Sequence, residues 1–381
     1  MIHTHTKPII EVFPHLDDVA NEVSAEAFFL KNSDSPLWMV TREPRLNELV
    51  TKLQHLRVRL MNDPEGFHRI YFSKSELEEV RNDFAKMILR GEEGLHRLSH
   101  LICNSFVNSY QLRSVIFGEV DKTKKRFTLN LDITPDELYS TPDIDLGTRQ
   151  LNRLRFNIGT TDNENWSSAS LVANTIDYLP TEPNEYKIHR IISRIKAEEE
   201  IWNKVVDEIF NLDSIVVRDK KLRQFSRFVK DIFGVKIVVG EDEDVYRVQH
   251  ALSQLRWSDE ALETVGAPPG PTTRTLELVE VKDYLGRRRK QSGWEAVKSV
   301  VRWNDKTFEI QVQPLRNFLR ERELLTKESH TSFKHERERV REQVAQRLPL
   351  FHFYQELLRW LFLFPNTPPP QYHQIHLQLV D

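Results

Sequence analysis

Residues 280–314 contain the residue types that nucleotide chemistry needs. Four cationic residues, 287–290, are followed by the pair Gly293-Trp294 and then by a carboxylate, Glu309. Cations bind phosphates, an aromatic ring stacks on a base, and a carboxylate binds a metal ion. Basic runs are also common in solvated loops, and a tryptophan beside a strand is commonly a core residue. This stretch alone therefore leaves both interpretations open.

A β-hairpin is predicted to hold this carboxylate. Apolar and polar residues alternate over residues 296–301 and again over 308–313, and Asn304-Asp305 between the two runs suits a tight turn. Glu309 would then share the polar face of the second strand with two glutamines.

Further charged residues precede this stretch. The apolar spacing over residues 191–209 predicts one long helix that carries Arg194, Lys196 and Lys204. A solvent-exposed helix face with internal salt bridges would have the same spacing. The next apolar run predicts a mostly buried strand that begins after Asp231, at a position where aspartate is ordinarily turn chemistry.

Three blocks of this sequence resemble, in order, the synthetase domain of the RelA/SpoT family, whose members make guanosine alarmones. The blocks are RIKAEEEIWNK, KDIFGVKIVV, and KDYLGRRRKQSGWEAVKSVV with FEIQVQP, and the resemblance covers about residues 187–335. It implies transfer of pyrophosphate from ATP to the 3′ hydroxyl of GDP or GTP. None of the 14 histidines precedes an aspartate, so the His-Asp hydrolase site of the long family members is not implied.

The resemblance implies a donor site that holds the phosphates of ATP. Arg194, Lys196 and Lys204 match the family's Arg-x-Lys motif and the lysine that follows it. Lys236 stands where the family usually has arginine, and Glu200 stands where it has serine.

The resemblance also implies a catalytic magnesium site. Asp231 and Glu309 match the family's two carboxylates, so both are predicted as catalytic residues and as Mg²⁺ ligands. Without the ion, the two carboxylates are expected to repel each other and to raise the pKa of one of them.

An acceptor site is implied by the remaining matches. Its predicted residues are Lys282, Lys290, Trp294, Lys298, Gln311 and His330. Trp294 stands where the family has tyrosine and Lys298 where it has histidine, yet tryptophan can still stack and lysine can still bind a phosphate. The choice of base in this pocket therefore stays open.

Length and composition bound the remaining possibilities. With 54 Lys and Arg against 57 Asp and Glu, the chain carries a formal net charge of −3, which argues against nucleic-acid binding through net charge. The single cysteine excludes a disulfide framework and suits a reducing cytoplasm. No secretory signal and no apolar run long enough to span a membrane is found, so we expect a cytoplasmic protein without a membrane partner.

The predicted fold class is α+β, with a mixed β-sheet flanked by helices as in a nucleotidyltransferase-like synthetase domain. We expect a separate helix-rich domain over residues 1–184, the synthetase-like domain over 185–335, and a helical extension with a Pro-rich tail over 336–381. Residues 141–184 have the composition of loops and mark the first boundary.

Three functions are compatible with these patterns. The first is an ATP-dependent pyrophosphokinase that makes a guanosine or adenosine alarmone. The second is a toxin of the same family that transfers pyrophosphate to the 3′ CCA end of tRNA. The third is a catalytically silent nucleotide sensor. Whether the chain forms a homo-oligomer stays open.

Overall fold

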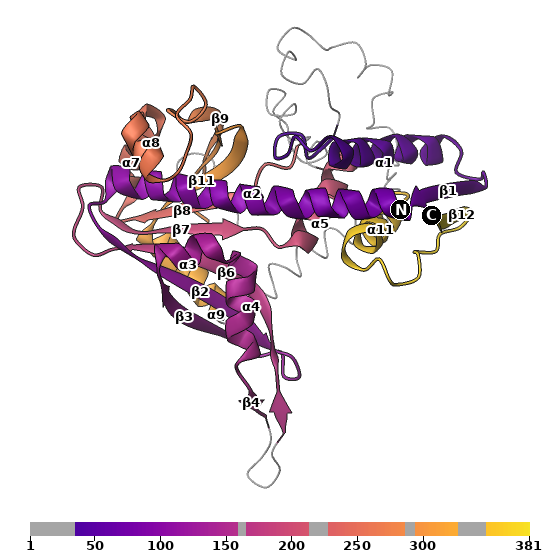
Figure 1. The fold of residues 1–381 in the computed structure, drawn as a ribbon, viewed down its shortest axis with the longest axis horizontal. Helices are drawn as coiled ribbons and strands as arrows, with labels where there is room; N and C mark the ends of the chain where they lie inside the picture. Colours follow the sequence, from indigo (N-terminus) through magenta and orange to yellow (C-terminus); the bar gives the residue numbers. More distant parts are fainter. Residues whose placement is uncertain (1–34, 159–164, 213–227, 286–293, 327–347) are drawn as a thin grey trace, which may run out of the picture. The chain divides into compact units, whose positions relative to one another are not determined.

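An eight-stranded β-sheet forms the centre of the computed structural model, which describes residues 35–158, 165–212, 228–285, 294–326 and 348–381 (Figure 1). The strands of this sheet are β2 (Tyr110–Val120), β3 (Arg126–Ile133), β6 (Ala169–Pro180), β7 (Ile188–Ile195), β8 (Phe233–Val239), β9 (Glu277–Asp283), β10 (Val297–Trp303) and β11 (Lys306–Pro314). Their order is β3-β2-β6-β7-β8-β11-β10-β9. The β8–β11 pair is parallel and the other pairs are antiparallel, so the sheet is mixed, as predicted.

The sheet runs across the predicted domain boundary at residue 184, and this part of the domain prediction is wrong. β6 pairs with β7 through Thr175–Tyr178, which joins the strands before the boundary to those after it. Ser35–Asp381 accordingly form one compact unit. The polar composition of residues 141–184 hid a helix, 143–152, and the long strand β6.

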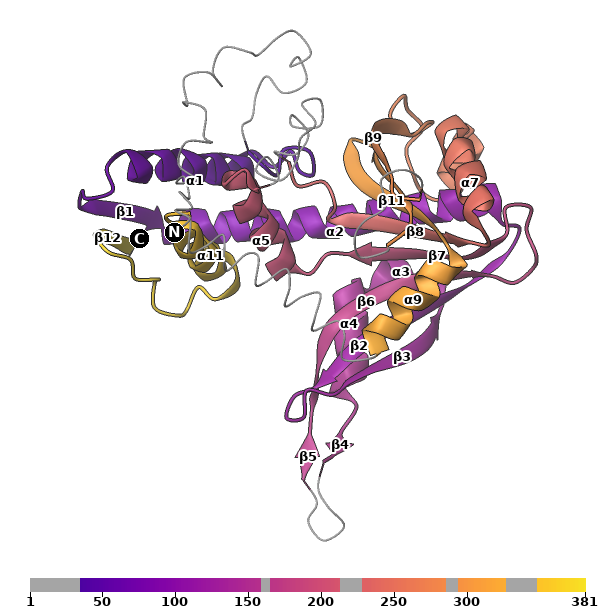
Figure 2. The ribbon, with the colours of Figure 1, turned by 180° about the vertical axis from the view of Figure 1, so that it is seen from behind.

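Helices flank the sheet, which confirms the α+β class (Figures 1 and 2). They are α1 (Pro44–Asn62), α2 (Lys74–Phe106), α3 (Pro135–Ser140), α4 (Asp143–Asn152), α5 (Glu198–Ile209), α7 (Asp242–Gln254), α8 (Asp259–Thr264), α9 (Leu315–Thr326), α11 (Phe351–Leu358) and the π-helical turn η5 (Arg359–Leu363). Two small sheets complete the fold, β1 (His68–Ser73) with β12 (Ile375–Val380) and β4 (Phe156–Asn157) with β5 (Trp166–Ser167). No helix among the described ranges has the length and apolar character that crossing a membrane requires.

The two faces of the sheet differ in chemistry because side chains alternate along each strand. One face is apolar: Ile191, Val235, Ile237 and Ile310 on it are at most 1 % exposed. The helix α2 packs against β7, β8 and β11. The opposite face carries charged side chains.

α2 is one continuous helix of 33 residues, and it contains two glycines, Gly91 and Gly94. A Cβ at Gly91 would lie 1.9 Å from the ring of Phe233, a residue that is 1 % exposed. Gly91 therefore lets the helix approach β8 closely. The helix begins after Ser73, whose hydroxyl accepts a hydrogen bond from the backbone N–H of Glu76.

Gly91→Ala is expected to lower the free energy of unfolding by about 1–3 kcal/mol, because the new methyl group overpacks a rigid core. Gly94→Ala, in the same helix, is the matched control. Its Cβ would meet Lys306 and Phe308 at 3.4 Å, a contact that a flexible lysine can relieve, so its helix-propensity gain should keep it neutral or stabilising. Denaturant unfolding measures both variants. Equal stabilities would contradict this account of Gly91.

The predicted hairpin is confirmed. β10 and β11 pair antiparallel through seven residue pairs from Val297↔Val312 to Trp303↔Lys306. Asn304 and Asp305 both have positive φ, 48° and 58°, as the two central residues of a type I′ turn require.

The segment after residue 348 is part of the core rather than a separate extension. Phe351, Tyr354 and Leu357 on α11 are fully buried, and the Tyr354 hydroxyl donates to the carbonyl of Leu53 at 2.7 Å. The predicted exposed tail ends in β12, which pairs parallel with β1. The apolar run 348–364 thus forms α11 and η5, which lie in the core.

Candidate functional site

The candidate site lies on the charged face of the sheet, which we define as the side that carries Glu309. Strand register places the main residues in two rows. Arg194, Gly234 and Glu309 are neighbours across β7, β8 and β11. Lys236 and Gln311 are neighbours in the next row, and Gln311 in turn pairs with Lys298 on β10. Residues in register point to the same side of a sheet, so these side chains share one surface.

Gly234 leaves room for the side chain of Arg194. A Cβ at Gly234 would lie 3.6 Å from both Cγ and Nε of Arg194 and 3.8 Å from the carbonyl of Glu309. The Arg194 side chain thus lies over the glycine, on the row that leads to Glu309. Arg194 is half-buried and forms no ion pair with any of the described residues. This guanidinium is available to a ligand, and its planar set of donors suits phosphate oxygens.

Asp231 lies at the entrance to β8, held beside the end of β7. The backbone N–H of Lys196 donates to the carbonyl of Ile232 at 2.8 Å, and Lys196 Nζ lies 2.7 Å from Asp231 Oδ2. Burial alone would raise the pKa of Asp231, but the charges of Lys196 and Lys298 outweigh it and hold that pKa below its usual range. The expected repulsion between the two carboxylates, with a raised pKa, is therefore not seen at Asp231.

Glu309 is 2 % exposed, so it does not lie on a solvent-facing strand surface. Its carboxylate pairs with Lys298 and accepts a hydrogen bond from Gln311. Burial alone would lower the pKa of Lys298, but the charges of Glu309 and Asp231 raise it. Lys298 is thus the cation that both carboxylates share.

The predicted donor residues Arg194, Lys196 and Lys204 do not lie on one helix, so the prediction of a single long helix over residues 191–209 is wrong. Arg194 lies on β7 and Lys196 lies just after it, whereas Lys204 lies on α5. Lys204 pairs with Glu208 at 2.9 Å, and its charge also acts on Asp231. The apolar residues of 191–195 belong to a buried strand rather than to a helix face.

Lys236, the fourth predicted donor residue, is held by α9. Its Nζ lies 2.7 Å from Glu321 Oε2, and the same carboxylate accepts hydrogen bonds from Gln313 and Trp294 at 3.0 and 2.6 Å. Trp294 also forms an edge-to-face contact with Tyr284, with ring centroids 5.5 Å apart.

The structure describes four of the six predicted acceptor residues. Trp294, Lys298 and Gln311 lie in the network just described, while Lys282 pairs with Glu280 at 2.9 Å on β9. Lys282 is the register neighbour of Lys298. The predicted residues Lys290 and His330 lie outside the described residues.

Sequence reasoning missed three residues that organise this face. Lys230 pairs with Glu280 at 2.6 Å, and Glu321 gathers Lys236, Gln313 and Trp294. The only sequence signal for Glu280 was its alternation with Lys282 on one strand. Lys230 stands directly before Asp231, but Glu321 lies on a separate helix and gave no signal.

The charged face fits a Mg²⁺ ion in its donor chemistry. Asp231 Oδ1 is buried and has no hydrogen-bond partner among the residues of the described ranges. Mg²⁺ binds such hard carboxylate oxygens. Glu309, the other predicted ligand, is paired with Lys298 in this structure.

Comparison with solved structures gives weak likenesses. The small alarmone synthetase 1 of Bacillus subtilis, solved with its product pppGpp, is 15% identical, with 42% of this chain and 80% of that chain covered at a TM-score of 0.23. A second structure of that synthetase is 16% identical, covering 46% and 75% at a TM-score of 0.24. The protein smu.1046c of Streptococcus mutans is 16% identical, covering 46% and 74% at a TM-score of 0.23. No protein-family model and no curated protein matches the chain. The interpretation of the site therefore depends on its own geometry.

Proposed function

We propose that this protein transfers pyrophosphate from ATP to the 3′ hydroxyl of a guanosine or adenosine nucleotide. One observation carries the proposal: two carboxylates from distant parts of the chain, Asp231 and Glu309, both act on the charge of Lys298, and Arg194 lies over Gly234 beside Glu309 without an ion pair to any described residue. The charges of Lys196, Lys204 and Lys298, from three separate segments of the chain, act on Asp231, and Lys298 also pairs with Glu309.

Pyrophosphate transfer requires an acceptor hydroxyl aligned with the β-phosphorus of ATP and neutralisation of the phosphate charge. In our proposal Arg194, Lys196 and Lys204 hold the phosphates of ATP. Lys298 turns from Glu309 to a phosphate of the acceptor, which frees Glu309 to take the proton of the attacking hydroxyl. Binding of the acceptor thereby activates the base.

Asp231 would hold Mg²⁺, which supplies charge neutralisation for the transferred group when it is bound, and a role of Glu309 as second ligand is the alternative to its role as base. Trp294 would stack on a base through its ring, because its indole N–H is already held by Glu321. Lys236 and Lys282 lie at the two sides of this surface, each beside one carboxylate that fixes its position.

The direct test is mass analysis of products after incubation with ATP, Mg²⁺ and one acceptor at a time: GDP, GTP, an adenosine nucleotide, or tRNA. A nucleotide that gains one pyrophosphate group, with release of AMP, supports the proposal. A product formed only with tRNA would assign the toxin reaction instead. ATP binding without any product would contradict the enzyme and leave a nucleotide sensor.

Arg194→Gln is expected to weaken ATP binding by about 10–100-fold, because a charge-assisted hydrogen bond is worth roughly 1.5–3 kcal/mol. Calorimetric titration with a non-hydrolysable ATP analogue measures the affinity. Arg302→Gln is the matched control, because Arg302 is a half-buried arginine on β10 that pairs with Glu277 at 3.2 Å. Equal affinities of the two variants would rule out the donor role of Arg194.

A further inference from the structure

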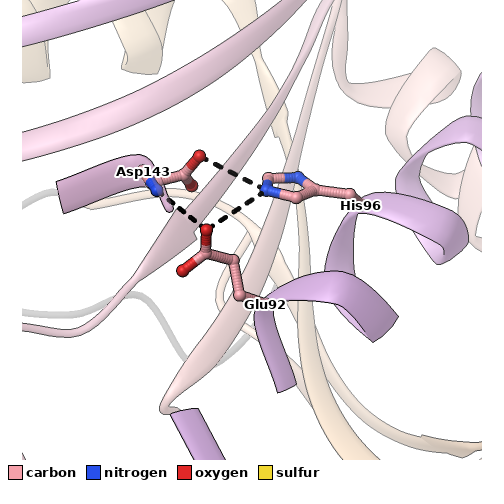
Figure 3. Close-up of side chains that lie close together, drawn as sticks. All are labelled: Glu92, His96 and Asp143. Atoms are coloured by element: carbon pink, nitrogen blue, oxygen red, sulfur yellow. Dashed lines mark hydrogen bonds and ion pairs between the residues drawn. The ribbon is translucent and has the colours of Figure 1, made fainter. Parts of the chain in front are cut away.

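A second cluster of chemistry-bearing side chains lies between α2 and the start of α4 (Figure 3). Glu92 and His96 are one turn apart on α2, and Asp143 is the first residue of α4. His96 Nε2 lies 3.9 Å from Glu92 Oε1 and 3.3 Å from Asp143 Oδ1. One ligand atom from each residue lies within 4.8 Å of the others.

This cluster belongs to the opposite side of the sheet from the charged face. The backbone carbonyl of Asp143 accepts a hydrogen bond from Asn174 on β6 at 2.7 Å. Asn174 and Asp177 are three positions apart on β6, so their side chains point to opposite faces of the sheet. Asp177 pairs with Arg190 at 2.9 Å. The cluster is therefore separate from the proposed transfer site, and the inference drawn from it does not depend on that proposal.

All three side chains are buried and incompletely satisfied. Glu92, His96 and Asp143 are 6 %, 1 % and 3 % exposed. His96 Nε2 faces both carboxylates without a hydrogen bond, and Asp143 Oδ2 also has no hydrogen-bond partner in the described part of the chain. Buried polar atoms are ordinarily hydrogen-bonded, so these orphaned atoms indicate a missing ligand.

The cluster also lacks a permanent positive charge. Within the described ranges, neither Glu92 nor Asp143 pairs with a lysine or an arginine. The backbone N–H of Asp143 donates to Glu92 at 2.8 Å and satisfies one oxygen. Two buried carboxylates without a cation are unfavourable.

We propose that Glu92, His96 and Asp143 bind a divalent transition-metal ion, with zinc as the ion of first choice. Zinc binds histidine nitrogen and carboxylate oxygen at about 2.0–2.2 Å, which puts neighbouring ligand atoms of a tetrahedral site roughly 3.3–3.5 Å apart. The 3.3 Å distance already matches this edge, and the 3.9 Å distance needs a small side-chain adjustment. An imidazole ligand favours zinc over magnesium or calcium, which prefer all-oxygen sites.

The other nitrogen of His96 faces Tyr178 rather than the two carboxylates. The Tyr178 hydroxyl lies 3.5 Å from His96 Nδ1, which leaves Nε2 directed at the two carboxylates. Because Asp143 begins α4, a bound ion would fasten α4 to α2, while the Asn174 hydrogen bond already holds α4 to β6. Burial of all three ligands assigns the ion a structural role.

Direct titration of the chelator-treated full-length protein with Zn²⁺ alone tests the site, with thermal unfolding and total metal content as further measurements. We expect one tightly bound equivalent that raises the unfolding temperature. Loss of a partner outside the ligand shell costs about 10–100-fold in metal affinity, so loss of the ligand in Asp143→Asn should weaken zinc binding by at least that factor. Glu93→Gln, at an exposed neighbouring carboxylate, should bind zinc as the wild type does.

Circular dichroism checks that each variant folds, and Glu92→Gln provides a second ligand variant if Asp143→Asn does not. Equal zinc affinity in the folded wild type and the folded ligand variants would overturn the proposal. So would a folded wild-type protein that binds no zinc, because protons alone would then balance the two carboxylates.

Discussion

Glu309→Gln is expected to abolish pyrophosphate transfer and, in the same molecule, to lower the free energy of unfolding. A general base contributes about 10²–10⁴-fold to a reaction rate, and an amide cannot take the proton. Removing one partner of a buried ion pair costs about 3–5 kcal/mol because the other charge is left buried without a partner. Lys298 would keep Asp231 as a neighbour, so the lower end of this range is expected.

Lost activity in this variant could therefore reflect unfolding, and a second variant separates the two effects. Glu309→Gln combined with Lys298→Met removes both buried charges and should regain most of the stability, because apolar replacement of a whole buried pair is often neutral. It should not regain activity. Product analysis and denaturant unfolding of both variants test this. Substantial turnover in either folded variant would refute the role of Glu309 as base.

Phe362→Ala is expected to lower the free energy of unfolding by about 3–5 kcal/mol, the usual cost of truncating a buried aromatic residue. Phe362, on η5, stacks on Trp202 of α5 with ring centroids 3.6 Å apart and planes inclined by 15°. Trp202 in turn lies 4.7 Å from Phe84 of α2. The substitution therefore leaves a cavity where three segments of the chain meet.

Phe364→Ala is the matched control, since Phe364 is two residues further along and 50% exposed. It should change the free energy of unfolding by less than about 1 kcal/mol, as surface substitutions usually do. Denaturant unfolding at one temperature measures both. Similar costs for the two variants would show that the segment after residue 348 is only loosely attached to the rest of the fold.

Elements with strong local signals could be predicted from the sequence. The hairpin was found because Asn304 and Asp305 tolerate positive φ and the flanking runs alternate. In α1 the buried apolar residues from Leu46 to Leu60 likewise follow the helical period. In both cases the chain within one element determines its structure.

Elements whose pattern depends on partners far along the chain were missed. The isoleucines of residues 191–195 fit both a helix face and a buried strand, and pairing with β6 and β8 decides the strand. β6 itself has a polar sequence because one of its faces lies on the charged side of the sheet. The role of Gly91 in α2 could not be read from the local sequence, because the ring of Phe233 that it accommodates comes about 140 residues later.

The candidate site could be predicted only as a set of residues. Asp231 and Glu309 were found from the resemblance, and the structure brings both beside Lys298. Their partners could not be assigned, since Lys196 binding Asp231 depends on how β7 meets the entrance of β8. Ion pairs between strands follow from register, and single-sequence patterns do not determine register across a large sheet.

The parallel pairing of β1 with β12 has a consequence for how the chain folds. His68 is in register with Ile375, so closing this contact spans about 300 residues and costs roughly 5 kcal/mol of chain entropy in the Jacobson–Stockmayer relation. Contacts of such separation form late. A nascent chain that has not yet reached residue 375 therefore leaves β1 with an unpaired edge, open to aggregation with other chains until synthesis passes β12.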